Sequence, residues 1–133
     1  MKTDKLLILA VILAACLHPF DAWAAGPRIS FQQEIKELDT VPSGQQVTVL
    51  FPFSNAGDIA LVVEGVEADC GCTEAYSRAL EVQPRDHSEI VAVLNTSRLS
   101  LGKNERHVYV RCNDPQRPRV TLALIVEVVR EPR

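Results

Sequence analysis

The last apolar stretch of the chain, Val120 to Val129, has an apolar residue at every even position from 120 to 128. A period of two residues places these side chains on one face of a β-strand, whereas a helix requires a period near 3.6. The same alternation occurs in Val47–Phe53 and in His107–Cys112. After Ala25, no stretch has an apolar stripe at helical spacing over three turns. The sequence therefore predicts an all-β protein.

Seven strands are predicted in total, separated by turn residues. Besides the three above, they are the segments 29–31, 60–66, 80–82 and 89–94. This close spacing favours an antiparallel sandwich over a parallel α/β sheet. Pro52 cannot donate a ladder hydrogen bond, so we expect it to face an edge or a bulge. The sequence from Asn55 to Asp58 is typical of a turn.

The N-terminal residues have the pattern of a secretory signal. Lys2 and Lys5 precede an apolar run over residues 6–17, and Ala22-Trp23-Ala24 provides a small-residue cleavage site. The run is shorter than the roughly 20 residues that span a bilayer. We expect cleavage after Ala24, a single domain over residues 25–133, and a periplasmic or secreted location.

A second processing route is open. Leu13-Ala14-Ala15-Cys16 is similar to a bacterial lipobox, in which the cysteine is lipidated and becomes the first residue. Cleavage would then remove residues 1–15, and a lipid on Cys16 would anchor the protein to a membrane.

Composition and motifs exclude several functions. The 14 Lys and Arg residues against 17 Asp and Glu give a net charge of −3, which lacks the basic field that nonspecific nucleic-acid binding needs. Asp86, His87 and Ser88 are adjacent on a predicted turn, whereas hydrolase triads are assembled from separated segments. No glycine-rich phosphate loop follows a strand. The sequence predicts no enzyme.

Several motifs resemble a bacterial secreted family catalogued as domain of unknown function 1573. They are Leu38-Asp39-Thr40-Val41, the stretch Phe51 to Gly57, Leu61-Val62-Val63, Cys70-Gly71-Cys72-Thr73 and Asn113-Asp114-Pro115. The resemblance covers residues 29–129. It implies an immunoglobulin-like sandwich related to the major-sperm-protein fold, with no established enzymatic activity, and structural roles for Asn55, Gly57, Gly71 and Thr73.

Two positions depart from the family pattern. Pro84-Arg85-Asp86-His87 stands where a Pro-Gly turn is usual, and a type I turn would accommodate it because Pro suits the second position. Cys112 stands where Thr or Ser is more ordinary.

Cys70 and Cys72 are the residues of this sequence that could support redox or metal chemistry. Three interpretations of the pair remain open. They could form a disulfide with each other, whose small ring would be strained and easily reduced. They could remain thiolates and bind a soft metal such as Cu(I) or Zn²⁺. They could also be small residues that shape a turn, with Gly71 allowing a tight backbone between them.

The expected topology places other residues relative to this pair. In an immunoglobulin-like sandwich, the strand ending at Cys70 runs antiparallel to the strand starting near His107. His107 would therefore lie near the pair, where two thiolates and one imidazole could hold Cu or Zn. The simpler interpretation, which we favour, is a surface histidine, because a fourth ligand is missing. Cys112 would lie roughly 17 Å further along the strand, beyond disulfide range, as a buried apolar residue.

The sequence thus predicts a noncatalytic extracytoplasmic module that binds another envelope protein, without a cofactor. The alternative is a redox or soft-metal protein centred on Cys70 and Cys72.

Overall fold

A computed structural model of the chain describes residues 25–132. The predicted signal peptide and Cys16 lie outside the described residues. Within the part that is described, no helix is long and apolar enough to cross a membrane.

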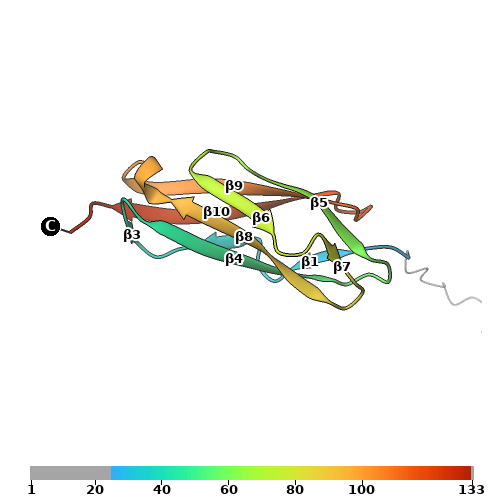
Figure 1. The fold of residues 1–133 in the computed structure, drawn as a ribbon. Coiled ribbons are helices and arrows are strands. Elements are labelled where there is room, and N and C mark those ends of the chain that lie inside the picture. The colour runs from blue at the N-terminus through green and yellow to red at the C-terminus, as the bar shows by residue number, and fades with distance from the viewer. Residues whose placement is uncertain (1–24, 133) are drawn as a thin grey trace, which may run out of the picture.

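Within residues 25–132, ten strands form two packed sheets, which lie along each other in Figure 1. The first sheet has the order β1-β4-β8-β6, and the second has the order β2-β10-β9-β5-β7 with β3 also paired to β10. The strands are β1 (Ile29–Phe31), β2 (Ile35–Glu37), β3 (Val41–Pro42), β4 (Gln46–Asn55), β5 (Leu61–Ala68), β6 (Thr73–Ser77), β7 (Glu81–Val82), β8 (His87–Asn95), β9 (Gly102–Cys112) and β10 (Arg119–Val129). A single 3₁₀ turn, η1 (Thr96–Arg98), connects β8 to β9.

The predicted all-β immunoglobulin-like sandwich is confirmed, but the predicted count of seven strands is wrong. The strands β2, β3 and β6 are present in addition to those predicted from the sequence. β2 and β3 have three and two residues, which is too short for alternation to show. β6 points Thr73, Ala75 and Ser77 toward the other sheet, and residues this small carry no apolar signal.

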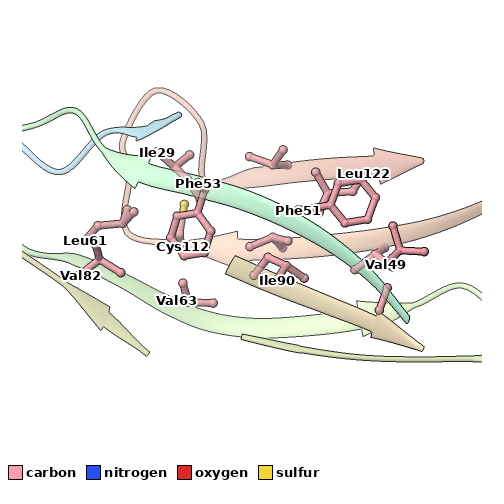
Figure 2. Close-up of a cluster of buried hydrophobic side chains, with 14 of the residues drawn as sticks. Ile29, Val49, Phe51, Phe53, Leu61, Val63, Val82, Ile90, Cys112 and Leu122 are labelled. Carbon is pink, nitrogen blue, oxygen red and sulfur yellow. The ribbon is translucent and has the colours of Figure 1, made fainter. Parts of the chain in front are cut away.

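The core lies between the sheets and follows the predicted alternation. Phe51 and Phe53 of β4 are fully buried, together with Ile90 of β8 and Leu122 of β10. Figure 2 shows these side chains filling the space between the two layers, with the sulfur of Cys112 among them. Burial of side chains of this size stabilises the fold by roughly 1.5–3 kcal/mol each.

The expectation that Pro52 faces an edge or a bulge is wrong, because β4 lies between β1 and β8 and its register with β8 is unbroken at Pro52. The Thr96 N–H donates to the carbonyl of Gln45, the residue just before β4. Because backbone groups of successive residues in a strand point to opposite sides, the odd-numbered residues of β4 form their hydrogen bonds with β8. Even-numbered residues therefore face β1, and the Pro52 carbonyl accepts from the Gln32 N–H at 3.2 Å. The missing N–H of Pro52 thus falls where the pairing with β1 ends.

The turn between β7 and β8 differs from the predicted type I geometry. The Asp86 N–H donates to the Gln83 carbonyl at 3.0 Å, so Pro84 and Arg85 are the central residues. Arg85 has a φ of +70°, which is the left-handed conformation that a type II turn requires at its third position. The backbone keeps the geometry of a Pro-Gly turn although the glycine is absent.

Candidate functional site

The Cys70-Gly71-Cys72 segment forms the corner where the chain crosses from one sheet to the other. It connects the end of β5, which pairs with β9, to the start of β6, which pairs with β8. The predicted antiparallel pairing before the corner is present, because Ala68 faces Val108 and the Asp69 N–H donates to the His107 carbonyl. The corner is thereby fixed to both sheets.

Cys70 and Cys72 form a disulfide with each other, and their Cα atoms are 5.3 Å apart. Of the three interpretations of the sequence, the structure therefore contains the first. The Cys72 N–H donates to Cys70 Sγ at 3.2 Å. The hydroxyl Oγ1 of Thr73 lies 3.7 Å from Cys72 Sγ and 4.0 Å from Cys70 Sγ. Because a disulfide sulfur has no proton, the hydroxyl is the donor in both contacts.

The two sulfurs differ in their surroundings. Cys72 is 6% exposed and belongs to a small hydrophobic cluster separate from the main core. Cys70 is only partly buried and packs against the edge of that cluster. Gly71, between them, is exposed, and its carbonyl accepts from Arg98 Nη1 at 2.9 Å.

His107 lies in the middle of β9, which begins at Gly102 and not near His107 as expected, and the end of β5 reaches it there. Its ring contacts carboxylates. Its ring Nδ1 is 3.1 Å from Asp69 Oδ2, and its Nε2 is 3.2 Å from Glu105 Oε1. The ring is partly exposed on the outer face of the sheet. Among residues 25–132, no group of three or more His, Cys, Asp or Glu side chains is arranged to hold a metal ion.

Cys112 is a free, buried cysteine within the main core, as the sequence predicts. Its Sγ donates to the Arg117 carbonyl at 3.3 Å. Burial raises the pKa of this thiol. Cys112 is therefore held as a neutral, buried thiol, whereas Cys70 and Cys72 are joined in a disulfide.

Asn55 organises the opposite end of the sandwich. Its fully buried amide donates to the Ile59 and Val82 carbonyls at 2.7 and 3.0 Å. Its Oδ1 accepts from the N–H groups of Gly57 and Arg28 at 2.9 and 3.2 Å. This Asx-type turn explains why asparagine precedes the loop.

Gly57 and Asp114 complete this end of the molecule. A Cβ on Gly57 would collide with the Gly26 carbonyl, so the close approach of the two backbones requires glycine. The Asp114 carboxylate is buried and accepts from the N–H groups of Ile29, Gln116 and Arg117. The motif residues here are structural.

The free edge of β6 was not predicted from the sequence. The Asn95 N–H donates to the Cys72 carbonyl, and the Arg78 N–H donates to the Glu89 carbonyl, so even-numbered residues of β6 bond to β8. The N–H and C=O groups of Ala75 and Ser77 therefore point away from the sheet. In the described part of the chain, no strand pairs with this side of β6.

A pocket of about 260 Å³ lies between the start of β6 and η1, beside the disulfide. Its lining is Gln46, Gly71, Cys72, Glu74, Val93, Asn95 and Arg98. The pocket therefore lies on the outer face of the four-stranded sheet, over β6, β8 and β4, and adjoins Cys72 of the disulfide.

A known protein family matches most of the chain. The family described as "Protein of unknown function (DUF1573)" matches residues 29–128, which is most of the chain. No curated protein matches the sequence.

Solved structures match the fold at low sequence identity. A protein of unknown function from Porphyromonas gingivalis W83 has a TM-score of 0.71 at 16% identity, covering 82% of this chain and 51% of that one. The present chain therefore spans about half the length of that protein. The PapD-like domain 7 of human CEP192 has a TM-score of 0.58 at 10% identity, with 87% and 97% coverage.

The periplasmic chaperone SfaE has a TM-score of 0.53 at 13% identity, covering 79% of this chain and 61% of that one. At these identities the likeness establishes a shared immunoglobulin-like and PapD-like fold, and nothing further.

Proposed function

Because the chain belongs to the DUF1573 family of proteins of unknown function and folds as an immunoglobulin-like sandwich, we propose that it is a noncatalytic binding module of the cell envelope. Its partner is another envelope protein that adds an extended segment to the free edge of β6. The observation that carries this proposal is the unpaired outer side of Ala75 and Ser77.

The β6 edge lacks the usual protection. Natural proteins blunt exposed edges with very short strands, lysine, proline or bulges. The other edge strands here, β1, β2, β3 and β7, have two or three residues, whereas β6 has five and contains neither lysine nor proline. Its register with β8 is regular throughout. Such an edge is suited to β-augmentation, in which main-chain hydrogen bonds supply the affinity.

The side chains beside this edge also favour binding. Tyr76 of β6 is 53% exposed, and a large aromatic side chain with a polar tip is typical of binding surfaces. Glu74, which is exposed on the same face of β6 as Tyr76, adds a negative charge that could fix the register of a bound segment.

Site-specific photocrosslinking in cells tests the proposal. We expect a photoreactive residue at position 76 to give a covalent adduct with a second protein, and Ala75→Pro to abolish that adduct. Proline removes an N–H that points away from β8, so the ladder with β8 stays intact. Ala75→Ser is the matched control, because it keeps the N–H. Ile35 is 61% exposed on the other sheet, so a photoreactive residue at position 35 measures the background of adducts formed by random collisions.

An adduct at position 76 that matches the background at position 35 would overturn the proposal. So would an adduct that persists in Ala75→Pro.

We propose that the protein acts outside the cytoplasm, after cleavage following Ala24 or, as the alternative, with a lipid on Cys16. The charged, apolar and small-residue order of the N-terminal sequence supports export. The Cys70–Cys72 disulfide is compatible with an oxidising compartment. Mass spectrometry of the protein from an envelope fraction would report the first residue and any lipid.

A thiol-based function is the second candidate, and the disulfide at the corner favours its redox form. A ring closed over a single intervening residue has little freedom to relax, and constrained disulfides are the more easily reduced ones. For soft-metal binding, the pair would first have to be reduced, and His107 would have to leave Asp69 and Glu105. Measuring the Cu(I) and Zn²⁺ bound by the reduced protein and by its Cys70→Ser and Cys72→Ser variants separates a metal-binding function from a redox function.

A further inference from the structure

The two sulfurs of the corner are not equivalent, and their difference assigns a direction to thiol–disulfide exchange. We propose that Cys70 is the sulfur that forms a mixed disulfide with a partner protein, and that Cys72 is the resolving cysteine. The substrate class is a polypeptide carrying two closely spaced thiols or the corresponding disulfide. This inference rests on the redox form of the second candidate function and names its reacting atom.

Access to the sulfurs favours Cys70. Exchange requires a thiolate to approach one sulfur in line with the S–S bond, so the attacked sulfur must be reachable. Cys72 is 6% exposed and is packed against Leu94 and Leu99. Cys70 is partly buried at the margin of the same cluster. An incoming thiolate therefore meets Cys70 Sγ first.

Local donors favour a reactive thiolate at Cys70 in the reduced protein. The Cys72 N–H, 3.2 Å from Cys70 Sγ, would donate to a thiolate at that position. Hydrogen bonds to the charged form stabilise a thiolate and make it a better nucleophile near neutral pH. The Thr73 hydroxyl, 3.7 Å from Cys72 Sγ, would stabilise the charge on Cys72 when it leaves.

The corner is held in place by contacts that do not involve the S–S bond. The Asp69 N–H donates to the His107 carbonyl, and the Asn95 N–H donates to the Cys72 carbonyl. Arg98 binds the Gly71 carbonyl at the tip. Reduction therefore leaves the two sulfurs close together, and an intramolecular attack by Cys72 on a mixed disulfide at Cys70 is favoured by proximity.

The step balances as a two-electron exchange. A partner thiolate attacks Cys70 Sγ, the Cys70–Cys72 bond breaks, and its electron pair passes to Cys72 Sγ, which takes up a proton. The partner's second thiolate then attacks the partner sulfur of the mixed disulfide and releases Cys70 as a thiolate. The partner dithiol is oxidised to a disulfide, and the Cys70–Cys72 pair is reduced. The reverse sequence reduces a partner disulfide.

The test compares two variants that each keep one of the two corner cysteines, and it uses glutathione disulfide as the probe. The full mature chain is prepared as Cys72→Ser and as Cys70→Ser, both reduced, and adduct formation is followed by mass spectrometry with peptide mapping. We expect the adduct at Cys70 to form at least about tenfold faster than the adduct at Cys72, because the latter sulfur is buried. Circular dichroism and denaturant unfolding establish that both variants are folded.

A second measurement uses the cell envelope. Cys72→Ser should accumulate reductant-sensitive adducts with other proteins, since the resolving thiol is absent, and Cys70→Ser should not.

Equal rates, or a faster reaction at Cys72, would overturn the assignment while leaving a redox function in place. An absence of reaction at both sulfurs would overturn the redox function together with the assignment.

Discussion

Asp69 contacts His107 twice through one carboxylate oxygen. Its Oδ2 accepts from the His107 backbone N–H at 2.9 Å and lies 3.1 Å from the ring Nδ1. The Asp69 N–H donates to the His107 carbonyl in return. These contacts hold the end of β5 against β9 at the residue before Cys70.

Removing the Asp69 carboxylate should loosen this corner. We expect Asp69→Ala to lower the free energy of unfolding by about 1 kcal/mol, since a partly exposed hydrogen bond to a carboxylate is lost. It should also speed reduction of the disulfide by dithiothreitol, because the first cysteine is less firmly held. Urea unfolding and timed thiol assays measure the two effects. The control is Glu67→Ala on the same strand, where the contact to Arg111 is 3.6 Å and both side chains are largely exposed. Equal reduction rates in the two variants would contradict the role given to Asp69.

Asn55 should contribute more to stability than any surface polar residue. Asn55→Ala leaves the N–H groups of Gly57 and Arg28 and the carbonyls of Ile59 and Val82 without their partner, and we expect a loss of about 3 kcal/mol or more. Asn95→Ala makes the same chemical change at the N-cap of η1, where about 1 kcal/mol is expected. Denaturant unfolding of both variants makes the comparison. Similar losses would mean that the loop can find other partners for its backbone.

Arg85 should be a position where a single substitution stabilises the protein. Its φ of +70° is costly for a residue with a Cβ, whereas glycine adopts it freely. After the greater chain entropy of glycine in the unfolded state is subtracted, we expect Arg85→Gly to raise the free energy of unfolding by up to about 1 kcal/mol. Arg85→Ala is the control, since it removes the charge but keeps the Cβ, and its stability should stay near that of the parent chain. A loss of stability in Arg85→Gly would show that the side chain has a role of its own.

Cys112 should be protected from chemical modification. Its thiol should also make the free energy of unfolding depend on pH in the alkaline range. Burial raises the pKa of its thiol above the unfolded value. The stability that the neutral thiol provides is therefore fully present below the unfolded pKa and is lost as the pH rises through the folded pKa.

Two measurements check Cys112. Iodoacetamide should label it at least about 100-fold more slowly in the folded protein than in urea. The difference in unfolding free energy between the parent chain and Cys112→Ala should shrink above about pH 8.5, the ordinary thiol pKa. Fast labelling of the folded protein would contradict the buried position.

Much of the fold follows from local patterns in the sequence. Strands such as β10 alternate over many residues, and their register determines which face is buried. The expected antiparallel pairing also places His107 of β9 beside the end of β5 and the corner. β6 escaped prediction because its inward residues are small, and yet its free edge carries the proposed binding function.

The state of the cysteines could not be derived from their spacing. Disulfide, metal site and plain turn all require the same two side chains, and the choice depends on what surrounds them. His107 shows this directly, because the carboxylates of Asp69 and Glu105 engage its ring. The left-handed conformation of Arg85 was likewise hidden, since a Pro-Arg sequence gives no local reason to expect it.

The most direct test of the account is cysteine mapping of the folded, unreduced protein purified from the envelope. After alkylation in urea and digestion with trypsin, Cys70 and Cys72 fall on the peptide covering residues 37–78, and Cys112 falls on another. We predict an unalkylated 37–78 peptide that is two hydrogens lighter than its reduced form, and an alkylated Cys112. Alkylated Cys70 and Cys72 without reductant, or a bond from either to Cys112, would contradict the account.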